Sequence, residues 1–165
     1  MNNRKRLIIW LFEKSQILYT KYFKKNKPWH INKSDLLLYP EGSFGKKLGE
    51  FLELHGFDII PKAERHDAYH ILTGYNTTVE SEIAQQYLCF GNGKRSPYLF
   101  GVMILGTLIL PEYIGFYIKS YHVGKTANVF HNLDFKNLLN TPFNDLQSCI
   151  FSKSHINKLI QSHHA

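Results

Sequence analysis

Apolar residues recur every three or four positions along most of the chain, and this spacing predicts helices rather than strands. The first such segment contains Leu7, Leu11 and Leu18 and predicts an amphipathic helix of about 17 residues that ends before Pro28. A second, short helix is expected to begin at Ser34 or Asp35, whose side chains can cap a helix.

The next three helices have predicted start and end signals. Ser43 is expected to cap a helix over residues 44–54, and Gly56 to end it as a C′ glycine. A helix from about Lys62 should end at Gly74, and Thr77 should cap the next, with Glu80 completing a capping box. The corner between these last two helices is only two or three residues long, so they must pack as neighbours.

The most apolar segment runs from Tyr98 to Leu110 and is interrupted by Pro111-Glu112. Hydrophobic on all sides, it is expected to form a central buried helix, while Gly101, Gly106 and Gly115 leave room for a neighbour. No uninterrupted apolar run reaches the roughly 18 residues of a membrane-spanning helix. We therefore predict an all-α, single-domain, multi-helix bundle over residues 1–165, with a very hydrophobic central helix.

The chain has a net charge of +7, and its basic residues are most closely spaced near the start of the chain. This basic segment, residues 1–27, has three alternative explanations, here in decreasing order of weight. It could be the solvent-exposed face of a docked helix, it could bind an anionic membrane surface, or it could bind nucleic acid. Within it we expect a membrane-facing surface and no nucleic-acid partner. The residues assigned to that surface are Arg4, Lys5, Arg6, Lys24 and Lys25.

The candidate chemistry lies around the short corner. His66 and His70 are spaced i and i+4 and project from one helix face, and Glu82 lies early in the following helix. Two imidazoles and a carboxylate, with Asp67 as a further carboxylate, suit a divalent ion and leave positions free for water or substrate.

The histidine spacing alone carries little information. With nine histidines in 165 residues, roughly 0.5 such pairs are expected by chance, and an acid directly after the first histidine lowers this to about 0.04. From the residues alone, a metal site and a structural cluster of histidines paired with carboxylates have about equal weight.

The segment His66-Asp67-Ala68-Tyr69-His70, followed after eleven residues by Glu82, resembles the HDxxH(x11)E motif of the Coq-four family of ubiquinone (coenzyme Q) biosynthesis proteins. Leu72-Thr73-Gly74-Tyr75 after the motif and Tyr39-Pro40-Glu41-Gly42-Ser43 before it also resemble that family. Asn76-Thr77-Thr78 departs from the glycine-threonine-aspartate that members often have there.

The resemblance implies an all-helical protein whose metal residues are His66, Asp67, His70 and Glu82. The expected metal is zinc, with iron, manganese and cobalt as alternatives. It also implies an isoprenoid or prenylated-quinone lipid beside the metal. The residues expected to contact that lipid are Leu99, Val102, Met103, Leu105, Gly106 and Leu110.

The function implied is oxidative decarboxylation of a polyprenylated hydroxybenzoate, in which a hydroxyl replaces the ring carboxyl. Asp67 is the candidate catalytic residue, either binding the metal or orienting a water molecule. The main alternative is a non-catalytic scaffold that presents quinone intermediates to partner enzymes, and a metal hydrolase with Asp67 as general base is a third. Further expected partners are other quinone-biosynthesis enzymes and a second copy of the chain, with a cytoplasmic location peripheral to the inner face of the membrane.

Overall fold

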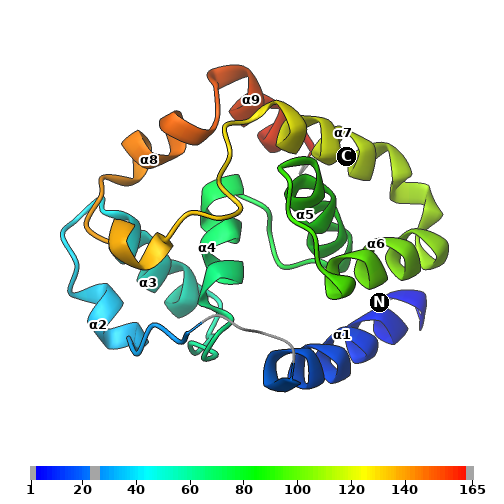
Figure 1. Cartoon of the computed structure of the whole chain (residues 1–165), viewed down its shortest axis with the longest axis horizontal. Coiled ribbons are helices and arrows are strands. Elements are labelled where there is room, and N and C mark those ends of the chain that lie inside the picture. The colour runs from blue at the N-terminus through cyan, green and yellow to red at the C-terminus, as the bar shows by residue number, and fades with distance from the viewer. Residues whose placement is uncertain (1–2, 23–26, 163–165) are drawn as a thin grey trace.

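The structure is a computed structural model that describes residues 3–22 and 27–162. In those ranges it contains helices and no strand, which confirms the predicted all-α class (Figure 1). The elements are α1 (Asn3–Tyr22), α2 (Lys33–Leu37), α3 (Phe44–Leu54), α4 (Glu64–Thr73), α5 (Val79–Gly91), α6 (Pro97–Ile109), η1 (Pro111–Tyr113), α7 (Ile114–Thr126), η2 (Phe135–Leu138), α8 (Phe143–Ile150) and α9 (Lys153–Ser162).

Several predicted helix ends are confirmed. The Ser43 side chain accepts a hydrogen bond from the Lys46 amide at the start of α3. Gly74 ends α4 in the left-handed conformation, with φ of 72°, which glycine adopts without steric cost.

Two predicted caps are wrong. The cap of α2 is Asn32, whose side chain accepts from the Asp35 amide, while Asp35 reaches back to complete a capping box. The cap position of α5 is Thr78 rather than Thr77, and its side chain makes no capping hydrogen bond. The Asn76 side chain instead accepts from the Thr78 amide, which closes a short turn before the helix.

Helix α5 is the most enclosed element, with eight buried residues against four in α6. It packs along α7 at very close range, because an added Cβ on Gly91 would meet the Tyr121 carbonyl and one on Gly124 would meet the Leu88 carbonyl. Helix α6 covers another side of α5 (Figure 1), where Ile83 fills the space beside Gly106.

Helix α6 therefore differs from the predicted central helix buried on all sides. Leu99, Val102, Met103 and Gly106 face the core, whereas Phe100, Ile104, Leu105 and Leu108 are exposed. Apolar residues occupy both faces of this helix, so the sequence alone carries no periodic signal of which face is buried.

The hydrophobic core joins residues from α1 to α9. Its largest fully buried side chains are aromatic, and Tyr69 of α4 contacts Phe130 and Phe135 edge-on, at ring-centroid distances of 5.7 and 5.8 Å. This packing fixes α4 against the segment that follows α7, close to the corner between α4 and α5.

Candidate metal centre

The corner between α4 and α5 brings three potential ligands together. His66 and His70 lie one turn apart on α4, and Glu82 lies in the first turn of α5. The Gly74 amide donates to the His70 carbonyl, so α4 ends one helical turn after the second histidine. Residues distant by 12 to 16 positions therefore meet in space.

The ligand atoms converge on one point. Nε2 of His66 lies 3.0 Å from Oε2 of Glu82, and Nε2 of His70 lies 3.0 Å from Oε1 of the same carboxylate. One ligand atom from each of the three residues lies within 4.8 Å of the other two, so the group could hold a metal ion. The two rings are nearly perpendicular, at 76°, with centroids 4.7 Å apart.

The second nitrogen of each histidine has its own acceptor. Nδ1 of His70 lies 2.9 Å from the Tyr75 carbonyl oxygen, and Nδ1 of His66 lies 3.5 Å from Oδ1 of Asp67. An Nδ1 proton shared with these acceptors leaves each Nε2 as the metal-binding atom, the arrangement typical of metal-binding histidines.

A second observation indicates that these three side chains could bind a divalent ion. Nε2 of His70 is buried and has no hydrogen-bond partner, although Oε1 of Glu82 is near. If Nδ1 of His70 donates to the Tyr75 carbonyl, neutral Nε2 faces the carboxylate oxygen with no proton between them, and a cation there would remove this conflict. Two imidazoles and one carboxylate are also a common zinc ligand set with an open position.

Charge coupling within the group shifts two pKa values. Burial alone would lower the pKa of His66, but the Glu82 carboxylate and the hydrogen bonds to Asp67 and Glu82 outweigh it and raise that pKa to about 9. Burial alone would raise the pKa of Glu82, yet the imidazoles of His66 and His70 bring it far below its ordinary value. Without a cation, His66 and Glu82 therefore form an ion pair at neutral pH.

Aromatic residues close one side of the group. The Phe51 ring of α3 stacks on His70, with centroids 5.6 Å apart and planes 14° apart, and His55 and Phe57 pack against Phe51. The sequence predicted a helix over residues 44–54 but not the contact of Phe51 with His70. The Tyr75 carbonyl was also missed, because a backbone acceptor has no sequence signature.

Asp67 differs from the other predicted metal residues. It lies outside the group of three and contacts the far nitrogen of His66 instead. Its side chain is 18% exposed and orients the His66 ring through Nδ1, the nitrogen that points away from Glu82.

The predicted lipid-contacting residues mostly point inward. Leu99, Val102, Met103, Gly106 and Leu110 are buried against the rest of the protein, and only Leu105 is exposed.

The predicted membrane-facing cations are partly engaged within the protein. Arg4 pairs with Glu112 at 2.8 Å, Lys5 pairs with Glu80 at 2.8 Å, and Arg6 is exposed. Lys24 and Lys25 lie outside the described residues.

Among the described helices, none by itself is long and apolar enough to cross a membrane, whereas the bent pair of α6 with η1 and α7 reaches that length and composition.

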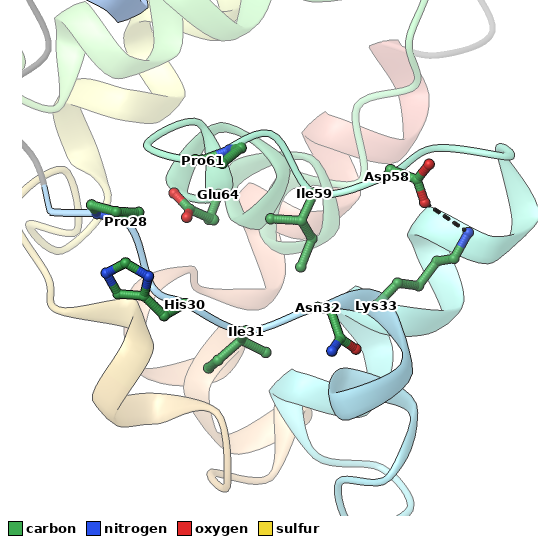
Figure 2. A pocket seen from close by; sticks show the side chains of 9 residues that line it. All are labelled: Pro28, His30, Ile31, Asn32, Lys33, Asp58, Ile59, Pro61 and Glu64. Carbon is green, nitrogen blue, oxygen red and sulfur yellow. Dashed lines mark ion pairs between the residues drawn. The ribbon is translucent and has the colours of Figure 1, made fainter.

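A cavity of ≈ 390 Å³ lies beside the start of α4, between residues 28–33 and 58–64 (Figure 2). Its most buried polar group is Glu64, whose carboxylate accepts a hydrogen bond from the Trp29 amide at 2.9 Å. None of the three residues of the metal group lines it. Glu64 thus ties the segment after α1 to α4, separately from the candidate metal centre.

Fold and site together define a class, an all-α protein with a two-histidine, one-carboxylate group at a helix corner. No protein-family model matches the chain, and no curated protein matches it in sequence. The crystal structure of a proposed ubiquinone biosynthesis protein from Nostoc punctiforme is similar in fold, with a TM-score of 0.63 and 16% identity, over 92% of this chain and 83% of that one. At this identity the similarity shows a shared fold.

Proposed function

We propose that this chain is a metal-dependent protein of ubiquinone or isoprenoid-quinone biosynthesis that replaces the ring carboxyl of a polyprenylated hydroxybenzoate by a hydroxyl. The observation that carries the proposal is the convergence of His66, His70 and Glu82, with separate acceptors on both Nδ1 atoms. The fold shared with a proposed ubiquinone biosynthesis protein supports the pathway.

In this proposal His66, His70 and Glu82 hold a divalent ion, zinc first and iron, manganese or cobalt as alternatives. The ion supplies Lewis-acid stabilisation of negative charge on a phenolic oxygen of the substrate. Asp67 holds the Nδ1 proton of His66 and so keeps Nε2 directed at the ion. The reaction releases the carboxyl as CO₂ and adds one oxygen atom to the ring, which is a two-electron oxidation. With water as the oxygen source and dioxygen as the oxidant it balances as ArCOOH + H₂O + O₂ → ArOH + CO₂ + H₂O₂.

A polyprenylated substrate is held in a membrane, so the proposal includes work at a membrane surface, at its cytoplasmic inner face, with other quinone-biosynthesis enzymes as neighbours. The prenyl chain is proposed to run along α6. Of the six residues predicted for that contact, Leu105 is the one already accessible, and the other five require the chain to enter between α6 and the core.

The metal assignment is tested by protein purified without chelator, with metal content measured by mass spectrometry. We expect about one divalent ion per chain, lost in Glu82→Gln and His70→Ala, and retained in His122→Ala, which removes an exposed imidazole away from the group. Circular dichroism checks that each variant folds. Unchanged metal content in both site variants would refute the assignment.

The reaction is tested separately, with a prenylated hydroxybenzoate carrying a labelled carboxyl carbon. Metal-loaded protein and dioxygen should release labelled CO₂ and form the hydroxylated ring, and Glu82→Gln should do neither. Metal retention and substrate binding without turnover would instead support the non-catalytic scaffold. In that case the metal held by His66, His70 and Glu82 would bind the head group of the lipid.

A further inference from the structure

The junction of α6, η1 and α7 exposes large apolar side chains. Leu108 is 73% exposed, Ile104 59% and Leu105 48%, and on α7 Ile114 and Ile118 are also exposed. Single exposed apolar residues are ordinary on protein surfaces, but five around one junction form a patch that marks an interaction site.

The geometry makes this junction a projection, which we call the apolar elbow and define as residues 104–118. The chain bends by 106° between α6 and the segment Pro111–Thr126. Both helices pack their inner sides on α5, so the elbow lies at one edge of the molecule (Figure 1). Ile104 and Leu108 are one turn apart on the outer face of α6, directed away from that packing.

Acidic residues are scarce around the elbow. Helix α6 contains no charged residue and α7 contains no acid. The one acid of the elbow, Glu112, is paired with Arg4, which also donates to the Ile109 carbonyl and so holds α1 at the elbow. Beside it, the outer face of α1 exposes Leu7 and Trp10 together with two cations, Arg6 and Lys14.

We propose that the apolar elbow, with the outer face of α1, docks the protein on an anionic lipid bilayer. The apolar side chains enter the boundary between headgroups and acyl chains, Trp10 lies at the headgroup level, and Arg6 and Lys14 meet lipid phosphates. A symmetric pair of chains joined through this face would bring the two sets of cations together, so an anionic bilayer fits the charges better than a second copy. The expectation of membrane contact is shared with the proposed function, but the docking surface rests on these side chains alone.

Flotation with vesicles tests the surface, using phosphatidylcholine alone and phosphatidylcholine with phosphatidylglycerol. The full chain should bind the anionic vesicles, and should bind more weakly at high salt and on phosphatidylcholine alone. The double variant Ile104→Asp, Leu108→Asp should partition into the anionic vesicles about tenfold less than the parent.

A matched control separates the elbow from added negative charge. Leu38, directly after α2, is 84% exposed, and Leu54, the last residue of α3, is 82% exposed. Helices α2 and α3 lie at the opposite end of the molecule from the elbow (Figure 1). The double variant Leu38→Asp, Leu54→Asp has the same net charge as the elbow variant and should bind vesicles like the parent. Glu82→Gln should also bind like the parent, so failure of the metal proposal is distinguishable from failure of the docking surface.

Equal flotation of the elbow variant and the parent would overturn the proposal, as would an equal loss in both aspartate variants. A parent that is dimeric, floats with no vesicle and becomes monomeric in the elbow variant would identify the elbow as a contact between copies instead.

Discussion

His66 lies between two carboxylates, and each of its nitrogen atoms has a different role. Nε2 faces Glu82 at 3.0 Å and Nδ1 faces Asp67 at 3.5 Å. A metal ion would replace the proton on Nε2 only, because Asp67 holds the Nδ1 side of the ring. At the scale of single residues, metal binding is therefore a competition between a metal ion and one proton.

The pH dependence of metal affinity follows from this competition. The pKa of His66 is raised to about 9, so the imidazole is protonated below that pH and each bound ion must displace a proton. We expect zinc affinity, measured by competition with a chelator, to rise about tenfold per pH unit from pH 7 to about 9 and then to level off. Constant affinity across this range would contradict the protonation of His66.

The same shifts govern the stability of the metal-free protein. His66 has a raised pKa, so its contribution is complete below its ordinary pKa of 6.5 and is lost as pH rises through about 9. Glu82 has a lowered pKa, so its contribution is present above its ordinary pKa of 4.5 and is lost as pH falls towards its folded value. The ion pair therefore stabilises the metal-free fold over roughly pH 5 to 9.

At the scale of elements, the contact between α5 and α7 includes a very close approach of the two backbones. Gly91 and Gly124 each face a carbonyl of the other helix so closely that a Cβ has no room. This approach sets the position of α5, and with it the position of Glu82 at its first turn.

Two alanine substitutions in α7 test this contact. Gly124→Ala would place a methyl group against the Leu88 carbonyl and should lower the free energy of unfolding by about 2 kcal/mol or more. Gly115→Ala lies in the same helix with nothing within 4 Å and should be neutral or stabilising by up to about 1 kcal/mol. Denaturant unfolding measures both, and equal effects would mean that helix propensity alone matters.

At the scale of the whole molecule, Asn92 connects distant segments. It is 5% exposed at the end of α5, and its amide donates to the carbonyls of Gly124 and Asn128 at 3.1 Å. Its oxygen accepts from the amides of Phe130 and His131, whose own carbonyl accepts from Arg65 and Tyr69 of α4. The chain after α7 is thereby joined to both helices of the candidate metal centre.

Asn92→Ala removes all four hydrogen bonds and leaves buried backbone groups unpaired. We expect a loss of about 2–4 kcal/mol in the free energy of unfolding. Asn140→Ala, at an exposed position, should change it by less than about 0.5 kcal/mol. A small effect in both variants would show that water replaces the Asn92 contacts.

The sequence by itself determined the helical class and singled out His66, His70 and Glu82, with Asp67, as candidate ligands. Helical periodicity is a local property, and a glycine-ended helix with a short corner leaves the next helix little freedom, so the ligand face was predictable. The cap at Ser43 was predictable for the same reason, since a capping side chain acts on amides only two or three residues away.

Only the tertiary structure decided which residues surround the ligands and which apolar surfaces remain exposed. The contact of Asp67 with the far side of His66 and the stacking of Phe51 on His70 depend on side-chain directions and distant packing. The outer face of α6 is as apolar as its inner face, so burial depended on where α5 and α7 lie and not on residue type. Long-range packing, which no local pattern encodes, left the apolar elbow uncovered.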